Sequence, residues 1–226
     1  MAWEQELQAE LNYWVWTMKH FYENVGELVG RDNLDKHLNY DVESLIGLPV
    51  GATVRILDVG AGPLSDLGFK SFRYKVQITC IDPLAEAYSK LLDQYQIGIG
   101  CPLRSIYGEV EKLTDSFKPG SFDVVVCLNC LDHTRDPVLG LNQMVDVLAP
   151  DGFVYVWCYQ NEGACENYQG LHQWDFDLLD NAVVLKGKDG DYQKVDALLK
   201  DGVVQKSWQG ELNNKPAIHF VIRRKQ

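Results

Sequence analysis

The chain has 226 residues, of which 46% are hydrophobic and 23% charged, with a formal net charge of −11. That length suits a single domain over residues 1–226 with a sizeable buried core. The acidic balance argues against a nucleic-acid partner, because phosphate binding depends on Lys and Arg. No apolar run reaches membrane length, and acid stands near the N-terminus where a signal peptide needs base, so we expect no membrane span.

Residues 3–25 have the spacing of an amphipathic helix. Apolar side chains recur along one face at Trp3, Leu7, Leu11, Trp14, Met18, Tyr22 and Val25. The opposite face carries Tyr13, Trp16 and His20. We therefore expect residues 1–49 to form a helical N-terminal extension or lid. Its second aromatic face indicates either a border of the substrate mouth or a homodimer interface.

From residue 50 to 149, short β-rich runs alternate with helical stretches, which predicts βαβ units and a parallel sheet with helices on both faces. The expected strands are Val54–Val59, Val76–Ile81, Leu103–Tyr107, Phe122–Leu128 and Gly152–Trp157. Residues 160–180 are predicted as loop and helix. Three later strands are expected at Ala182–Lys186, Val203–Trp208 and Ala217–Arg223, and antiparallel pairing would let them close the sheet. The predicted class is α/β, with a mostly parallel sheet and late antiparallel strands.

A glycine turn follows the first predicted strand. Gly60, Ala61 and Gly62 come directly after Asp58 and Val59, and glycines permit tight turns and close approach of a ligand. The second strand ends in a further acid, Asp82, about two dozen residues later, where an acid can bind ribose hydroxyls. A structural interpretation also exists, since a strand-ending Asp can merely cap a helix. We favour ligand binding at this edge.

The ordered set of segments over residues 50–158 resembles the class I S-adenosylmethionine (SAM)-dependent methyltransferase family. The resemblance implies a Rossmann-like fold and SAM as cofactor. It implies cofactor contacts at Asp58, Gly60, Ala61, Gly62, Asp82, Pro83, Glu109, Val110 and Asn129. Two positions depart from the family pattern: Leu64 replaces a third glycine, and Asp151 replaces a glycine of a late turn.

The resemblance implies an enzyme that methylates a small molecule or glycan, most simply at a hydroxyl. The alternative is a non-catalytic SAM-binding subunit or scaffold of a larger enzyme. The insert at residues 159–176 is rich in aromatic and amide side chains, which suit a hydroxyl-rich acceptor, although a packed surface loop has the same composition. For the acceptor's proton, we expect His172 as general base, with His133 as second choice.

No metal is expected. The five histidines do not form a ligand-spaced cluster in the sequence, and Asp132 with His133 offers too few ligands. Cys127 and Cys130 form a C-x-x-C pair without a second such pair, which favours packing in strand and loop over zinc. The scattered cysteines suggest a reduced protein of the cytoplasm.

Overall fold

A computed structural model describes residues 2–225, without the side chains of residues 2–5. The sequence predicts one domain, whereas the contacts within the chain group it into two compact units, Met1–Glu109 and Val110–Gln226. Each unit has its own strands and its own functional residues. Within residues 2–225, no helix is both long and apolar enough to cross a membrane.

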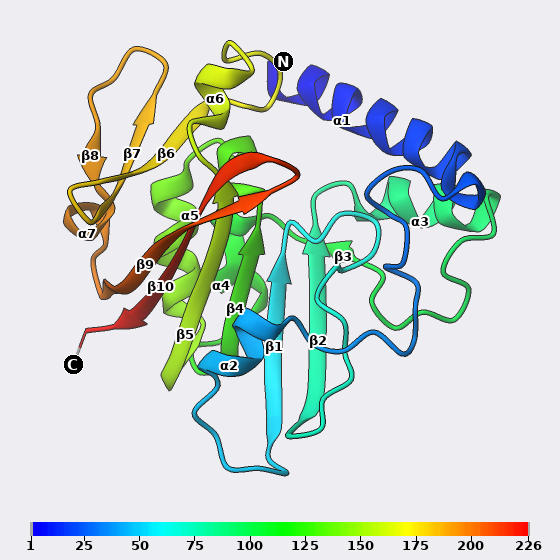
Figure 1. Ribbon diagram of the computed structural model, residues 1–226, viewed down its shortest axis with the longest axis horizontal. Helices are drawn as coiled ribbons and strands as arrows, with labels where there is room; N and C mark the ends of the chain where they lie inside the picture. Colours follow the sequence, from blue (N-terminus) through cyan, green and yellow to red (C-terminus); the bar gives the residue numbers. More distant parts are fainter. Residues whose placement is uncertain (1, 226) are drawn as a thin grey trace. The chain divides into compact units, whose positions relative to one another are not determined.

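The first unit holds three helices, a 3₁₀ turn and three strands (Figure 1). In chain order these are α1 (Ala2–Lys19), η1 (Phe21–Glu23), α2 (Tyr40–Leu45), β1 (Thr53–Val59), β2 (Lys75–Asp82), α3 (Ala85–Gln94) and β3 (Ile106–Tyr107). Strand β2 pairs in parallel with β1 on one side and with β3 on the other. Parallel pairing puts the carboxyl ends of β1 and β2, and the acids that they carry, at the same edge.

Helix α1 is part of the core of this unit rather than a loose tail. Trp14 and Met18 are buried in one cluster with Leu64, Tyr88 and other apolar side chains. Two residues of the predicted apolar stripe were placed wrongly, because α1 ends at Lys19: Tyr22 is 70% exposed and Val25 is 42% exposed. The side chain of Trp3 lies outside the described part of the chain.

The second unit has seven strands and six short helical elements. Its helical elements are η2 (Val110–Lys112), α4 (Leu113–Ser116), η3 (Leu131–His133), α5 (Pro137–Asp146), α6 (Glu162–Cys165) and α7 (Val195–Leu198). Its strands are β4 (Phe122–Leu128), β5 (Leu148–Tyr159), β6 (Trp174–Leu179), β7 (Ala182–Gly187), β8 (Gln193–Lys194), β9 (Gly202–Leu212) and β10 (Lys215–Arg224).

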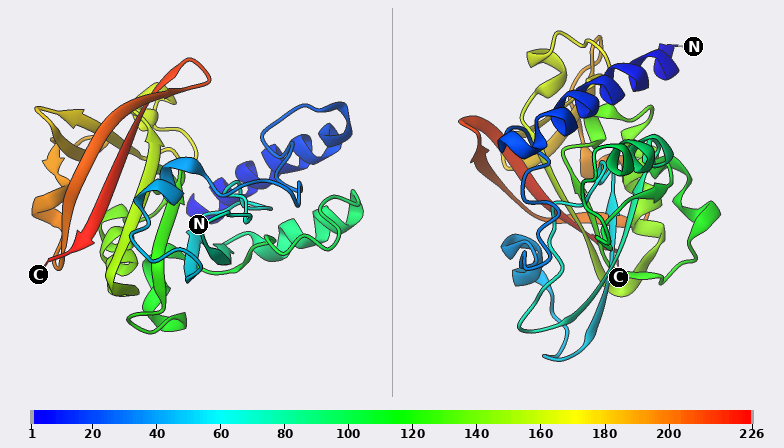
Figure 2. Two further views of the ribbon diagram at one scale, coloured as in Figure 1. Left: turned by 60° about the horizontal axis from the view of Figure 1, so that its bottom comes forward. Right: turned by 90° about the vertical axis from the view of Figure 1, so that its right-hand side faces the viewer.

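These strands form two groups. Strand β4 pairs in parallel with β5, and β10 pairs antiparallel with both β5 and β9, so two of the three predicted late strands close the sheet. The third, β7, corrects the prediction, because it pairs with β6 and β8 instead. Figure 2 shows the long β9–β10 hairpin running beside β5 from two further sides. A smaller antiparallel sheet has the order β6–β7–β8. Strand β6 corrects the prediction of loop and helix over residues 160–180, because β7 supplies it with a pairing partner.

Candidate active site

The glycine turn of the first unit has the backbone that only glycine adopts readily. Gly60 and Gly62 have φ angles of 64° and 66°. The N–H groups of Gly60 and Ala61 both donate to the carbonyl of Ile81, at 2.9 and 3.1 Å. A Cβ on Gly62 would come within 3.1 Å of the Trp14 ring. The turn is thus fixed between the end of β2 and helix α1.

Asp58 lies near the end of β1 and is 2% exposed. The Ser65 hydroxyl donates a hydrogen bond to its carboxylate at 2.5 Å. Burial raises the pKa of Asp58 to about 7, although the bond from Ser65 and the charge of Arg31 act in the opposite direction. Sequence reasoning identified Asp58 but missed Ser65, whose role depends on a turn that brings it back to the strand end.

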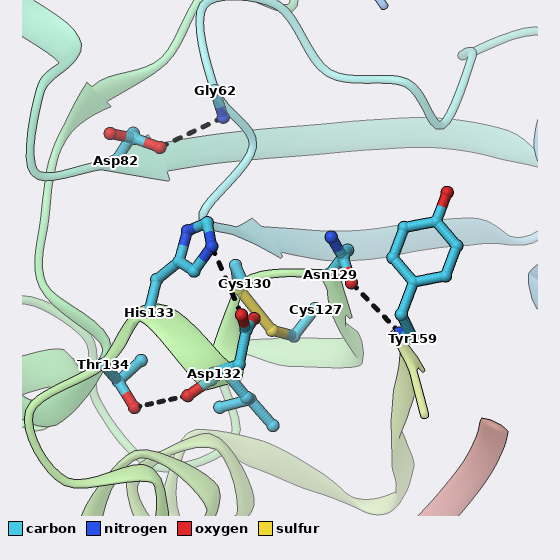
Figure 3. Close-up of a disulfide and its surroundings, with 10 residues drawn as sticks. Gly62, Asp82, Cys127, Asn129, Cys130, Asp132, His133, Thr134 and Tyr159 are labelled. Carbon is cyan, nitrogen blue, oxygen red and sulfur yellow. Dashed lines mark hydrogen bonds and ion pairs between the residues drawn. A yellow bond between two sulfur atoms is a disulfide. The ribbon is translucent and has the colours of Figure 1, made fainter. Parts of the chain in front are cut away.

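Asp82 is the last residue of β2, and its carboxylate connects the end of β2 to the turn that follows β1. Its carboxylate accepts from the N–H of Gly62 at 3.1 Å (Figure 3). It also accepts from the N–H of Leu84 at 2.8 Å. Burial raises its pKa to about 7, and the two backbone hydrogen bonds lower it. Each carboxylate oxygen has two lone pairs, so both retain an acceptor position. Pro83 follows directly and is half-buried.

Helix α1 and the segment after it hold this turn from the other side. The Trp14 indole donates to Glu10 at 2.8 Å, and the Arg31 guanidinium lies 5.4 Å from the centre of the Trp14 ring. Arg31 also donates to the carbonyl of Leu64 at 3.1 Å. The sequence pattern gave no signal for Arg31, because its partners are about thirty residues away in the chain.

The predicted adenine contacts, Glu109 and Val110, stand where the two units meet in sequence. The Tyr107 hydroxyl donates to the Glu109 carboxylate at 2.6 Å. Val110 is buried and begins η2. Glu109 is half-buried, so its carboxylate can still reach solvent.

In the second unit, Asn129 links the end of β4 to β5. Its backbone is left-handed, with φ of 51°. Its N–H donates to the carbonyl of Trp157 at 2.6 Å, and its side-chain oxygen accepts from the N–H of Tyr159 at 3.1 Å (Figure 3). Asn tolerates this conformation better than most residues, which fits its place in the turn.

The two predicted histidines lie together, although they are 39 residues apart in sequence. His133 Nε2 lies 3.0 Å from His172 Nδ1. Both nitrogens face one oxygen of Asp132, at 3.3 Å from His133 and 2.7 Å from His172. Asp132 and His133 belong to η3 (Figure 3), and His172 comes from the segment before β6. We call Asp132, His133 and His172 the His–Asp cluster.

Burial and the neighbouring acids shift the pKa of His172 in opposite directions. Burial lowers the pKa of His172, but the hydrogen bond and the charge of Asp132, with the charges of Glu162 and Glu166, outweigh that effect. The net result is a pKa above the ordinary value for histidine. Asp175, three residues after His172, accepts from the Ala164 N–H and the Tyr168 hydroxyl.

Glu162 adds a second buried carboxylate beside the cluster. It is 7% exposed, and burial followed by the charge of Asp132 raises its pKa to about 8. Among the described residues, neither Glu162 Oε2 nor Asp132 Oδ1 has a hydrogen-bond partner.

Cys127 and Cys130 flank Asn129 and are joined in a disulfide, with their Cα atoms 6.3 Å apart (Figure 3). Cys127 is fully buried in β4, as the packing interpretation predicts. The bond between the two sulfurs differs from the reduced state expected from the sequence. The disulfide holds the residues that lead from β4 into η3.

Comparison with known proteins gives a consistent result. Residues 57–156 match the family model described as a methyltransferase domain. A ubiquinone biosynthesis O-methyltransferase of Xanthomonas euvesicatoria is 32% identical over 105 residues, 46% of this chain and 43% of that protein. A protein of the same name from Vibrio cholerae is 29% identical over 118 residues, 52% of this chain and 46% of that protein. The matches thus span about half the length of these curated relatives.

Two solved structures share the fold. A TehB-like SAM-dependent methyltransferase from Corynebacterium glutamicum has a TM-score of 0.53 at 12% identity, covering 96% of this chain and all of that one. A SAM-dependent methyltransferase from Methanosarcina mazei has a TM-score of 0.52 at 15% identity, covering 84% and 99%.

Residues 57–156 thus match a methyltransferase domain, and the chain shares the fold of two SAM-dependent methyltransferases. The Rossmann-like, mostly parallel fold with late antiparallel strands is therefore confirmed, and SAM is the cofactor named for both of these neighbours. The residues of this chain fit SAM as a cofactor. Its glycine turn leaves backbone uncovered by Cβ atoms, and two buried carboxylates, Asp58 and Asp82, end adjacent strands. Such acids suit the cationic and hydroxyl groups of SAM.

Proposed function

We propose that this methyltransferase transfers the methyl group of SAM to a hydroxyl group of a small molecule. The observation that carries the proposal is the His–Asp cluster, which follows the carboxyl end of β4 and can accept the proton of a hydroxyl group. The O-methyltransferase names of the curated relatives point in the same direction.

We assign the cofactor contacts residue by residue. Asp58 binds the α-amino group of SAM, and Asp82 binds the ribose hydroxyls. The turn from Gly60 to Gly62 contacts the methionine part. Pro83 borders the ribose, and Asn129 offers backbone to the methionine part. Glu109 and Val110 take the adenine. The burial of both aspartates supports this assignment, because each buried carboxylate keeps acceptor lone pairs beyond the hydrogen bonds that it receives from the protein.

SAM supplies a sulfonium methyl group that is open to in-line attack. Bound SAM would supply this methyl group to the acceptor oxygen and would leave as S-adenosylhomocysteine, with the electron pair of the broken sulfur–methyl bond on sulfur. The hydroxyl proton leaves toward the His–Asp cluster, with His172 as first recipient and His133 as second. The protein's further contribution is positioning, which lowers barriers for such displacements.

A glycan hydroxyl is a narrower version of the acceptor. The insert at residues 159–176 suggested it, but much of that insert is used in packing. The Trp174 indole donates to the Thr134 carbonyl at 2.9 Å, and Phe176 is buried against Phe220. A second copy of the chain remains a candidate partner, because Tyr13 and Trp16 are 40% and 48% exposed on α1.

The decisive experiment incubates the full chain with SAM and a panel of phenols, catechols and sugars, and measures S-adenosylhomocysteine. We expect formation that depends on one class of hydroxyl acceptor. If SAM binds in calorimetry and no acceptor gives turnover above the rate without protein, the alternative of a non-catalytic SAM-binding subunit takes its place.

Replacement of Asp82 tests the ribose contact. Asp82→Ala should weaken SAM binding by about 1–3 kcal/mol, measured by calorimetry, because the hydroxyls lose a charged acceptor. Asp82→Asn is the matched control for shape, and it should lose less because its carbonyl oxygen still accepts. Equal dissociation constants for all three proteins would remove the ribose assignment.

SAM affinity should depend on pH through Asp58. Its pKa of about 7 means that the carboxylate is mostly protonated at pH 6 and mostly ionised at pH 8. Because the ammonium group needs the ionised form, affinity should rise up to about tenfold from pH 6 to pH 8, one pKa unit being a tenfold change. Asp58→Asn should bind more weakly and flatten this part of the profile. An unchanged profile in Asp58→Asn would assign the dependence elsewhere.

A further inference from the structure

Three side-chain atoms of the His–Asp cluster converge on one point. The separations among Asp132 Oδ2, His133 Nε2 and His172 Nδ1 are 2.7, 3.0 and 3.3 Å. Two imidazoles and a carboxylate are ligands typical of transition-metal sites. We propose that Asp132, His133 and His172 bind one divalent transition-metal ion, with the Glu162 carboxylate beside it.

The triangle has the size that a metal ion imposes. With metal–ligand bonds of about 2.0–2.2 Å, neighbouring ligand atoms lie about 3.0 Å apart in octahedral sites and about 3.4 Å apart in tetrahedral ones. The three measured separations centre on 3.0 Å. A small inward adjustment of either imidazole is enough to place all three ligands on one ion.

Hydrogen bonds alone cannot satisfy all three side-chain atoms of this arrangement. If both ring nitrogens carry hydrogen toward Asp132, two N–H groups face each other across the 3.0 Å between His133 and His172. If only one carries hydrogen, a single proton is divided among three atoms. A cation accepts the lone pair of all three atoms at once, which removes the conflict.

Unpartnered buried oxygens supply an independent reason. Asp132 is 1% exposed and Glu162 is 7% exposed, yet Asp132 Oδ1 and Glu162 Oε2 have no hydrogen-bond partner among the described residues. Buried polar atoms normally have partners, and two buried carboxylates near one another require positive charge. A divalent ion at the cluster supplies that charge.

The ligand set also selects the kind of metal. Two imidazoles favour zinc, iron, cobalt or nickel, whereas magnesium and calcium prefer sites made of oxygen alone. The imidazoles of His133 and His172 are 21% and 29% exposed, so an ion can enter from solution on their side. The expectation of no metal rested on the absence of a cluster in the sequence, and the fold supplies that cluster.

This inference rests on the proposed function for its purpose, since a hydroxyl that joins a metal ion loses its proton more readily. With Nδ1 of His172 bound to the ion, Nε2 is the ring nitrogen of His172 that accepts this proton. The test of the inference does not rest on the proposed function. Metal binding can be measured without SAM and without an acceptor, so failure of methyl transfer and failure of metal binding are separate results.

The full chain is first freed of metal with a chelator and kept under a reductant, which is then removed. It is then titrated with cobalt(II) and zinc(II). We expect one ion per chain, a visible cobalt spectrum and a higher unfolding temperature with zinc. His172→Ala and Asp132→Asn should each weaken binding by at least about a hundredfold, because even outer-shell partners are worth about ten- to a hundredfold.

His37→Ala is the matched control, because His37 lies in the first unit and its ring contacts Phe72 in a tilted arrangement instead. It should bind like the unmodified chain. Circular dichroism establishes that each variant is folded. No binding in the unmodified chain, or binding that survives both cluster variants, overturns the proposal. A thiolate-to-cobalt charge-transfer band, lost in Cys130→Ser, would place the ion on the C-x-x-C pair and overturn it as well.

Discussion

His172→Ala should lower kcat for methyl transfer by about a hundred- to ten-thousandfold, the usual worth of a group that handles the reacting proton. The imidazole is held by Asp132 at 2.7 Å and by His133 at 3.0 Å, so its loss dismantles the His–Asp cluster. Initial rates at saturating SAM and acceptor measure the effect. The dissociation constant of SAM should remain within about twofold, because the assigned cofactor contacts do not include His172.

The controls separate chemistry from folding. His37→Ala removes a histidine outside the cluster and should leave kcat unchanged. His172→Asn keeps a polar side chain of similar reach, and it should remain folded while transferring methyl slowly. If His172→Ala retains near-normal kcat and His133→Ala does not, the role moves to His133. If both retain it, positioning alone drives the transfer.

The strands that the sequence predicted well are those whose signal is local. Strand β4 matches its predicted bounds, and β1 differs only by including Thr53, because continuous apolar runs between turn residues are visible within one short window. The glycine turn and its two acids were found for the same reason. They stand at fixed short distances from strand ends.

The parts that were missed depend on partners distant in sequence. Strand β6 includes Asp175 and Asp177, which reduced its apolar signal, and both acids find partners only when the insert folds back. The His–Asp cluster requires that His172 cross 40 residues to meet Asp132. No periodicity records such a meeting, so the sequence predicted two separate histidines rather than a cluster.

The N-terminal helix shows a case in which the sequence pattern predicted more regular structure than the fold contains. Its spacing predicted a stripe through Tyr22 and Val25, but α1 ends at Lys19 and Asn24 takes a left-handed conformation with φ of 57°. Amphipathic spacing shows which face packs while the helix lasts, and it does not by itself show where the helix ends. What the helix covers became visible only in the fold.

Trp14→Ala should lower the free energy of unfolding by about 3–5 kcal/mol, the usual cost of truncating a buried aromatic residue. Trp14 is 5% exposed, packs edge-on against Tyr88 and closes over Gly62, so the variant should also weaken SAM binding at the glycine turn. Trp16→Ala is the matched control on the same helix, because Trp16 is 48% exposed, and it should cost less than about 1 kcal/mol. Urea denaturation followed by circular dichroism measures both variants. Equal stability of the two would show that α1 does not contribute to the core, and it would return the helix to the role of a detachable lid.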